Sequence, residues 1–313
     1  MRTCVIGGHG FVGRHVVRAL LSSGRDVLVL GRRRDRPDEL PQAAAYASCD
    51  LVDRISLRYH LEGVGEIVSL AHATPPVLGS KDLVGDHVAN LQPVLVLLEE
   101  AERLAGLRKL IVTSSGGTVY GVADQLPISE DAPTRPVSPY GITKLAIERY
   151  ALMFHLLRSL PVAIVRPSNV YGVGQRAFTG QGFIATAIGH ALRDEPIAIF
   201  GDGLTTRDYI HVNDVAAGIA AVLDMGSLGE AYNLGTSIGR SNLDILDFLR
   251  QRALADNLTL EVQQLPARGF DVPINVLSYE KLFSQTGWCP KEHFEERVAE
   301  MWSAMKAMFA SNG

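Results

Sequence analysis

Residues 3–13 read Thr-Cys-Val-Ile-Gly-Gly-His-Gly-Phe-Val-Gly, a short apolar run that passes directly into a glycine-rich turn. Gly7, Gly10 and Gly13 satisfy the spacing Gly-x-x-Gly-x-x-Gly, and Gly8 adds the related pattern Gly-x-Gly-x-x-Gly. A tight turn from a strand into a helix needs a residue with positive φ, and the helix must pack closely on the strand. A ligand bound at the turn must also approach the backbone closely. Each requirement excludes a Cβ at one position.

The helix that follows this turn begins with unpaired backbone N–H groups and with the positive end of the helix dipole. Phe11 and Val12 lie in its first turn, between two of the glycines. A pyrophosphate group binds favourably at such a helix terminus. The segment therefore predicts a dinucleotide-binding site to which Gly7, Gly10, Phe11, Val12 and Gly13 contribute.

The rest of the first half alternates short β-branched runs with longer amphipathic segments. We expect strands at 3–7, 26–30, 66–70, 109–113 and 162–166, and helices near 14–22, 87–105 and 139–157. This alternation is typical of a parallel sheet covered by helices on both faces and joined by right-handed crossovers. It predicts an α/β fold with a Rossmann-type doubly wound parallel sheet.

The pattern changes after Pro167, where glycines interrupt periodic segments that become shorter and less regular. This change predicts a dinucleotide-binding domain over residues 1–168 and a smaller C-terminal α/β substrate domain over 169–313. An apolar helix near 212–224 can pack on the sheet, so we expect residues 204–235 to return to the first domain.

Composition limits the classes of function. A chain of 313 residues with 47% hydrophobic content can bury a large core, and a net charge of −4 offers no extended positive surface for nucleic acid. No charged-then-apolar leader opens the chain, and no apolar run approaches the ~20 residues that cross a bilayer. The 3 cysteines and 9 histidines show neither a disulfide pattern nor metal-ligand spacing. We expect a cytoplasmic protein without a metal, a nucleic-acid partner or a membrane partner.

The end of the second strand bears on the choice of dinucleotide. An acidic residue usually accepts the adenosine ribose hydroxyls of NAD there, but Gly31 takes this place and Arg32 opens the run Arg32–Arg34. Arginine here suits the 2′-phosphate of NADP, whereas the same run on an exposed loop is compatible with NAD. The cofactor is therefore NAD or NADP. We expect Asp50 and Leu51 to reach its adenine and Ala71 its nicotinamide side.

Tyr140 and Lys144 begin a helix just after Pro139, one turn apart on the same face. A phenol with its ordinary pKa of ~10 is a poor base at neutral pH, but an adjacent ammonium and a positive nicotinamide both favour the phenolate. Lys144 can also bind the cofactor ribose. Together with the glycine turn, the pair predicts a catalytic centre with Tyr140 as acid/base.

Strings in separated parts of the chain resemble the extended short-chain dehydrogenase/reductases, specifically the NAD-dependent epimerase/dehydratase family. They are the glycine turn, Ser114–Gly121, Tyr140–Lys144, Arg166–Gly172, Gly201–Val212 and Tyr232–Gly235. The resemblance implies an enzyme of nucleotide-linked sugars in which Lys144 assists Tyr140. It further implies that Asn169 contacts the sugar nucleotide and that Arg207 and Arg268 clamp its diphosphate, as guanidinium forks bind phosphate bidentately.

The sequence departs from the family at a third catalytic hydroxyl, because Gly116 takes the position where many relatives carry serine or threonine. Ser115 and Thr118 flank this position, and either hydroxyl can serve. Family dehydratases carry an acidic residue directly after it, where this chain has Gly117. We therefore do not expect dehydration.

Three functions remain open. The first, which we favour, is a nucleotide-sugar epimerase of the UDP-hexose 4-epimerase type, in which the sugar gives hydride to a tightly bound cofactor and takes it back on its other face. The second is an NADPH-dependent reductase of 4-keto sugar nucleotides. The third, a dinucleotide-sensing module without turnover, does not need the tyrosine and lysine. Excess apolar residues in 94–104 and 144–157 indicate a homodimer.

Overall fold

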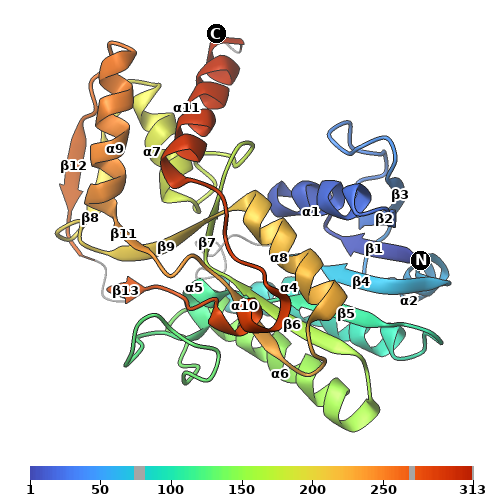
Figure 1. Ribbon diagram of the computed structural model, residues 1–313. Coiled ribbons are helices and arrows are strands. Elements are labelled where there is room, and N and C mark those ends of the chain that lie inside the picture. The colour runs from blue at the N-terminus through green and yellow to red at the C-terminus, as the bar shows by residue number, and fades with distance from the viewer. Residues whose placement is uncertain (74–81, 268–271, 312–313) are drawn as a thin grey trace.

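The computed structural model of the chain describes residues 1–73, 82–267 and 272–311. Its largest element is a seven-stranded sheet with the strand order β10-β6-β5-β4-β1-β2-β3 (Figure 1). The strands are β1 (Arg2–Ile6), β2 (Asp26–Gly31), β3 (Ala45–Ser48), β4 (Val64–Ser69), β5 (Lys109–Thr113), β6 (Val162–Pro167) and β10 (Ala231–Leu234). Every neighbouring pair is parallel, which confirms the predicted Rossmann-type doubly wound sheet.

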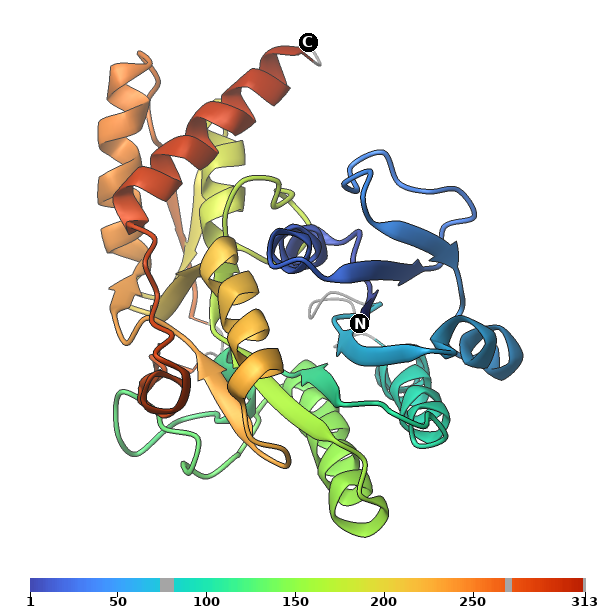
Figure 2. The ribbon, with the colours of Figure 1, turned by 45° about the vertical axis from the view of Figure 1, so that its right-hand side comes forward.

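Side chains of the sheet alternate between two apolar cores, one on each face. Cys4 and Ile6 of β1 face the first core, whereas Val5 between them faces the second. The first core is closed by α2 (Arg54–Leu61), α4 (Leu83–Ala101) and α6 (Pro139–Arg158). The second is closed by α1 (Phe11–Ser22) and α8 (Val212–Met225), so helices cover both faces of the sheet (Figure 2).

The strand order reverses beside β1. From β1 the chain moves to β2 and β3 on one side, and it then returns to β4 on the other side. Ligands of open parallel sheets bind outside the carboxyl ends of the strands at such a switch point. The Leu70 N–H, just after β4, donates to the Ile6 carbonyl at 3.0 Å, so the loops after β1 and β4 leave the sheet side by side.

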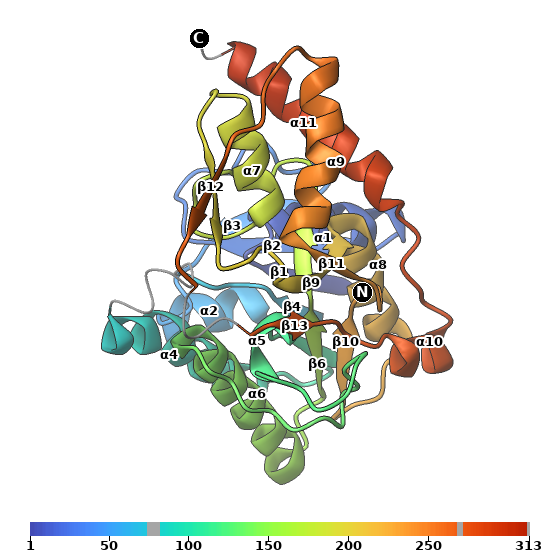
Figure 3. The same cartoon turned by 90° about the vertical axis from the view of Figure 1, so that its left-hand side faces the viewer.

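A smaller layer lies at one end of the molecule (Figure 3). Its strands are β7 (Asn169–Tyr171), β8 (Ile197–Phe200), β9 (Thr206–His211), β11 (Gly239–Ser241), β12 (Val262–Leu265) and β13 (Ile274–Asn275). β9 pairs with β7, β11 and β13, while β8 pairs with β12. The helices α7 (Phe183–Ala191), α9 (Asn242–Ala255) and α11 (Phe294–Ser311) close an apolar core here, and α10 (Glu280–Thr286) packs near β10.

The chain passes between the two layers more than once. The helix expected near 212–224 is α8, and it packs on the large sheet together with β10. β9, which also lies within residues 204–235, belongs to the smaller layer instead. The division at residues 168 and 169 therefore remains a prediction.

Element boundaries follow local capping. α4 begins at Leu83 rather than at residue 87, because the Asp82 carboxylate accepts a hydrogen bond from the Gly85 N–H at 2.8 Å and so starts the helix earlier. α6 begins at Pro139, where the Ser138 hydroxyl accepts from the Gly141 N–H at 3.2 Å. Among the described helices, none is long and apolar enough to cross a bilayer.

Candidate active site

A cavity of about 1090 Å³ lies at the carboxyl ends of β1, β4, β5 and β6 and extends to the smaller layer. From the large layer its lining includes Gly7, Gly10, Phe11, Val12, Gly13, His72, Ser115, Thr118, Tyr140 and Lys144. From the smaller layer it includes Asn169, Gln175, Phe178, Thr205, Arg207, Tyr209 and Asn242. Residues that are far apart in the sequence thus share one space.

The glycine turn has the geometry of a phosphate cradle. Gly7 has a φ of 78°, and the Gly10 N–H donates to the Gly7 carbonyl at 3.0 Å. A Cβ on Gly13 would lie only 2.2 Å from that same carbonyl oxygen. α1 starts directly after Gly10 without a side-chain cap, so the turn and the N–H groups of the first helical turn fit the pyrophosphate of a dinucleotide.

The loop after β4 lies against this turn. A Cβ on Gly7 would stand 3.1 Å from the Ala71 nitrogen and 3.2 Å from its Cα. Ala71 therefore lies next to the glycine turn. We expect it to contact the nicotinamide side of a dinucleotide. That contact itself remains a prediction.

The residues proposed for the adenosine end gather at the end of β2. The Cys49 N–H donates to the Gly31 carbonyl at 2.8 Å, so Asp50 and Leu51 directly follow this point. Leu51 is buried, whereas Asp50 is exposed and accepts a hydrogen bond from the Val52 N–H at 3.2 Å. Their contact with adenine remains a prediction.

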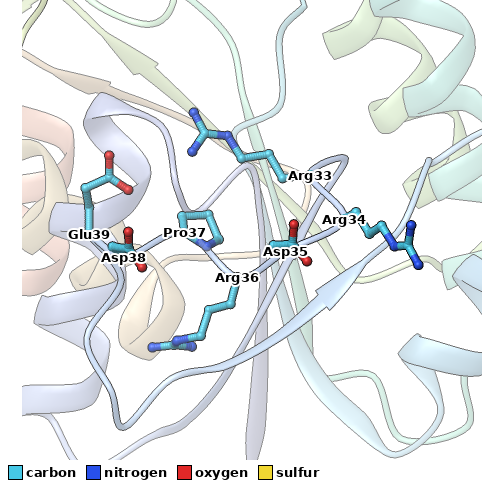
Figure 4. Close-up of a pocket in the computed structure, with 7 residues that line it drawn as sticks. All are labelled: Arg33, Arg34, Asp35, Arg36, Pro37, Asp38 and Glu39. Carbon is cyan, nitrogen blue, oxygen red and sulfur yellow. The ribbon is translucent and has the colours of Figure 1, made fainter.

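The arginine run lies on an exposed loop that surrounds a shallow pocket of about 400 Å³ (Figure 4). Arg36 turns back and donates to the carbonyls of Ala44 at 2.7 Å and Pro41 at 2.7 Å, so it holds the loop. Arg33 and Arg34 point in different directions (Figure 4). Burial lowers the pKa of His9. The positive charge of Arg33 lowers it further, the carboxylate of Glu39 opposes this, and Arg32 makes a smaller contribution in the same direction as Arg33, so charges of both signs act on this residue of the glycine turn.

Tyr140 and Lys144 meet at the end of β5. The Lys144 ammonium donates to the Thr113 carbonyl at 3.0 Å, and its Nζ lies 5.7 Å from the centroid of the Tyr140 ring. Both residues line the cavity. The helical spacing therefore brings the pair together as the sequence predicts.

Burial controls the protonation of this pair. Burial raises the pKa of Tyr140 to about 12, although a hydrogen bond with the Ser115 side chain opposes the rise, and nearby Asp86 adds to it. Burial lowers the pKa of Lys144 to about 8, against the carboxylates of Glu148 and Asp86. In the folded chain alone, the charge of Lys144 does not offset the effect of burial on the pKa of Tyr140. The phenol is therefore protonated at neutral pH.

The two candidate hydroxyls differ in their partners. Ser115 forms the hydrogen bond with Tyr140, whereas the Thr118 hydroxyl donates to the Ser115 carbonyl at 3.4 Å. A Cβ on Gly116 would lie 2.8 Å from the Arg166 carbonyl oxygen, which belongs to the backbone of β6, so this position has no space for a side chain. The geometry therefore favours Ser115 over Thr118 as the third hydroxyl.

Asn169 and Arg207 lie on neighbouring strands of the smaller layer, and both line the cavity. β7 pairs with β9 so that Asn169 stands opposite Tyr209. The Asn169 amide donates to the Asp208 carbonyl at 3.3 Å, and the Arg207 guanidinium donates to the Thr206 carbonyl at 2.9 Å. Arg268, the other expected diphosphate ligand, lies outside the described residues.

His72 is a cavity residue that the sequence analysis missed. It follows Ala71 in the loop after β4, and its ring packs edge-to-face on Tyr140, with 4.8 Å between the ring centroids. A usable signal was present, because polar residues that follow a buried parallel strand lie at the binding edge of the sheet.

Comparisons with known proteins identify a family over most of the chain. The NAD dependent epimerase/dehydratase family matches residues 3–235. A UDP-glucose 4-epimerase of Mycolicibacterium smegmatis is 32% identical over 307 residues, covering 96% of this chain and 97% of that protein.

Two solved structures share the whole fold. UDP-glucose 4-epimerase of Thermotoga maritima, crystallised with UDP-glucose, has a TM-score of 0.91 and 29% identity and covers 99% of this chain and 100% of that one. The Thermus thermophilus UDP-glucose 4-epimerase in complex with NAD has a TM-score of 0.88 and 31% identity, covering 98% and 99%. The expected enzyme class, an NAD(P)-dependent nucleotide-sugar epimerase, is confirmed. The chain belongs to the NAD dependent epimerase/dehydratase family.

Proposed function

We propose that this chain is a nucleotide-sugar epimerase of the UDP-hexose 4-epimerase type. One observation carries the proposal, namely that a single cavity joins the glycine turn, the Tyr140–Lys144 pair, and the Asn169 and Arg207 side chains. A dinucleotide on the turn and a nucleotide sugar on the smaller layer would meet at Tyr140. The relatives from M. smegmatis, T. maritima and T. thermophilus carry the name of this activity.

The residues divide the work by position. Gly7, Gly10 and Gly13, with the start of α1, would hold the pyrophosphate of the dinucleotide, and Lys144 would bind its ribose. When bound in its oxidised form, the nicotinamide supplies a reversible hydride acceptor and a positive charge.

Tyr140 would take the proton of the sugar hydroxyl and later return it to the keto oxygen, so one residue is both base and acid. Ser115, hydrogen-bonded to Tyr140, would assist this transfer. Because burial holds the phenol protonated in the folded chain, the proposal requires further positive charge at the site before Tyr140 acts as a base.

Anchoring the diphosphate lets the sugar turn without leaving the cavity. Arg207 and Arg268 would bind the phosphate oxygens, and Asn169 would contact the sugar nucleotide. Strong binding of the invariant nucleotide part with weak hold on the hexose suits an enzyme that must offer both faces of the sugar to one hydride acceptor. Arg207 lines the cavity on β9, which supports this assignment.

For the dinucleotide we propose a preference for NADP over NAD. Gly31 ends β2 where an acidic side chain would repel a 2′-phosphate, and a Cβ there would stand 2.8 Å from His9 Nδ1. Arg32 and Arg33 follow on the exposed loop and bring positive charge to this end. The T. thermophilus relative was crystallised with NAD, so the affinities of this chain for NAD and NADP should be measured side by side.

We also propose a homodimer through α6. Leu156 is 80% exposed and Leu157 is 71% exposed, and Met153 and Tyr150 add apolar surface to the same helix. Residues 94–104 contribute little to such a face, because Val94, Leu97 and Leu98 of α4 are buried in the core of the chain. Light scattering after gel filtration should give twice the mass of the chain, and Leu156→Glu should halve it.

The test is turnover without consumption of a reductant. Purified protein should convert UDP-glucose to UDP-galactose, or the reverse, with no net change in the absorbance of reduced nicotinamide, and Tyr140→Phe should abolish the conversion. Stoichiometric oxidation of NADPH by a 4-keto sugar nucleotide, with no interconversion of the hexoses, would decide for the reductase.

A further inference from the structure

His72 is a direct neighbour of Tyr140. It lines the cavity together with Tyr140, Lys144 and Ser115. Its imidazole meets the Tyr140 ring edge-on, with 4.8 Å between centroids and an interplanar angle of 80°. A sugar hydroxyl within hydrogen-bond reach of the tyrosine oxygen therefore brings its neighbouring groups close to the imidazole.

Both ring nitrogens of His72 lack a hydrogen-bond partner among the described residues. Nδ1 and Nε2 are buried, and in the part of the chain that the structure describes neither makes a hydrogen bond. A buried donor or acceptor without a partner costs free energy, and native proteins leave few such groups unexplained. An imidazole with two free nitrogens at a cavity wall is explained if a ligand supplies the missing bonds.

The charge state of His72 limits what that ligand group can be. Burial lowers the pKa of His72 to about 3, and the positive charge of Lys144 contributes while Asp86 opposes. The imidazole is therefore neutral at physiological pH, with one donor and one acceptor. A sugar hydroxyl also donates and accepts, so it matches this pair of nitrogens, whereas a phosphate oxygen only accepts and would be better bound by a cation.

A hydrogen-bonded frame fixes the backbone beside His72. The Ala73 N–H donates to the Asn90 side-chain carbonyl at 2.7 Å, and the Asn90 amide donates to Asp86 Oδ1 at 2.9 Å. The Thr143 hydroxyl donates to Asp86 Oδ2 at 2.8 Å. Because Thr143 directly precedes Lys144, the frame holds the loop of His72 on the same scaffold as the catalytic pair.

We propose that His72 is a substrate-binding residue that hydrogen-bonds a hexose hydroxyl close to the reacting carbon C4, namely the hydroxyl at C3 or the one at C6. The proposal rests on the nucleotide-sugar epimerase function above. It assigns the hydroxyl-rich sugar, rather than the diphosphate or the dinucleotide, as the partner of the imidazole.

His72→Phe tests this contact because it keeps an aromatic ring against Tyr140 and removes both nitrogens. We expect kcat/KM for UDP-glucose to fall about tenfold to a hundredfold, as for the loss of a buried hydrogen bond. His72→Asn, which keeps a donor and an acceptor, should lose less. The half-buried His155 on α6 does not line the cavity, so His155→Phe should stay within about twofold of wild type.

Deoxygenated substrates identify the partner. UDP-glucose analogues that lack the hydroxyl at C3 or at C6 should be compared in wild type and in the His72→Phe variant. With one analogue, kcat/KM of the wild type should fall about as much as it falls on substitution of His72. With the same analogue, kcat/KM of the variant should fall almost no further. Full additive losses with both analogues would overturn the proposal.

Two other results separate this proposal from the assignment of function. A tenfold loss of dinucleotide affinity in His72→Phe would place the imidazole on the cofactor and would overturn the proposal. Activity of Tyr140→Phe near that of wild type would refute the proposed function itself. Loss of activity in Tyr140→Phe with wild-type kinetics in a folded His72→Phe would overturn only the role of His72.

Discussion

Gly13→Ala tests whether the glycine turn depends on backbone packing as the structure indicates. An alanine Cβ would lie 2.2 Å from the Gly7 carbonyl oxygen and 2.6 Å from Gly8 Cα. An ordinary contact begins at 3.4 Å, so α1 and the turn would have to separate by roughly 1.2 Å (3.4 − 2.2). The opposing atoms belong to the backbone, so no side chain can rotate away.

The expected cost follows from overpacking. Inserting a methyl group into a well-packed site costs about 1–3 kcal/mol of unfolding free energy. At about 2–4 °C per kcal/mol, the melting temperature without added dinucleotide should fall by about 2–12 °C. Dinucleotide affinity should fall as well, because α1 is pushed away from the turn that it completes.

Gly10→Ala is the matched control within the same turn. In the described part of the chain, its Cβ would meet the Gly7 carbonyl oxygen alone, at 3.3 Å, and Gly10 has an ordinary φ of −69°. We expect a melting temperature within about 2 °C of wild type but weakened dinucleotide binding, since the methyl group would stand between the backbone and the pyrophosphate. Thermal unfolding followed by circular dichroism and calorimetric titration measure both quantities. An unchanged melting temperature for Gly13→Ala, or an equal loss in both variants, would refute the packing argument.

Three further experiments test the site. Ser115→Ala should slow turnover at saturating substrate at least tenfold, because the Ser115 side chain is hydrogen-bonded to Tyr140. Thr118→Val should stay within a few-fold of wild type. The reverse ranking would transfer the role to Thr118. Arg207→Ala should weaken nucleotide-sugar binding about tenfold to a hundredfold in titrations and leave dinucleotide binding unchanged, since charge-assisted bonds contribute about 1.5–3 kcal/mol; equal curves would remove Arg207 from the site. Replacing Arg32 and Arg33 together by alanine should reduce affinity for NADP at least tenfold more than affinity for NAD, and an equal effect on both would contradict a 2′-phosphate contact.

Much of the large sheet is predictable because its strands are continuous apolar runs buried on both faces. β5 agrees with its expected residues 109–113, and α6 extends only one residue past the expected end at 157. β3 and α2 escape prediction for the opposite reason. β3 is a short edge strand with no fully buried residue, and α2 is mostly polar and is held by the Asp53 cap.

The site is predictable where chemistry is encoded by spacing along one element. The turn Gly7–Gly13 and the helical pair Tyr140 and Lys144 are of this kind, and the structure brings them into one cavity. Contacts between elements are not encoded in this way. Whether Ser115 or Thr118 is the partner of Tyr140 depends on how the end of β5 meets α6.

Burial likewise cannot be read from spacing. The number of apolar residues in 94–104 predicts an exposed face for a dimer, but most of these residues pack into the first core. His72 has no motif around it, and its proposed role rests on its ring contact and on two ring nitrogens that make no hydrogen bond within residues 1–73, 82–267 and 272–311. The raised pKa of Tyr140 is a further consequence of packing that the position of Lys144 in the sequence does not disclose.

The most direct test of the account follows the hydrogen on the reacting carbon. UDP-glucose deuterated at C4 should be incubated with the purified enzyme in ordinary water, and the product should be examined by mass spectrometry and NMR. We expect UDP-galactose that keeps its deuterium at C4, with none formed by Tyr140→Phe, because the same hydride returns to the sugar that gave it. Product that has exchanged this deuterium with solvent, or no epimer at all from a folded protein with bound dinucleotide, would contradict the account.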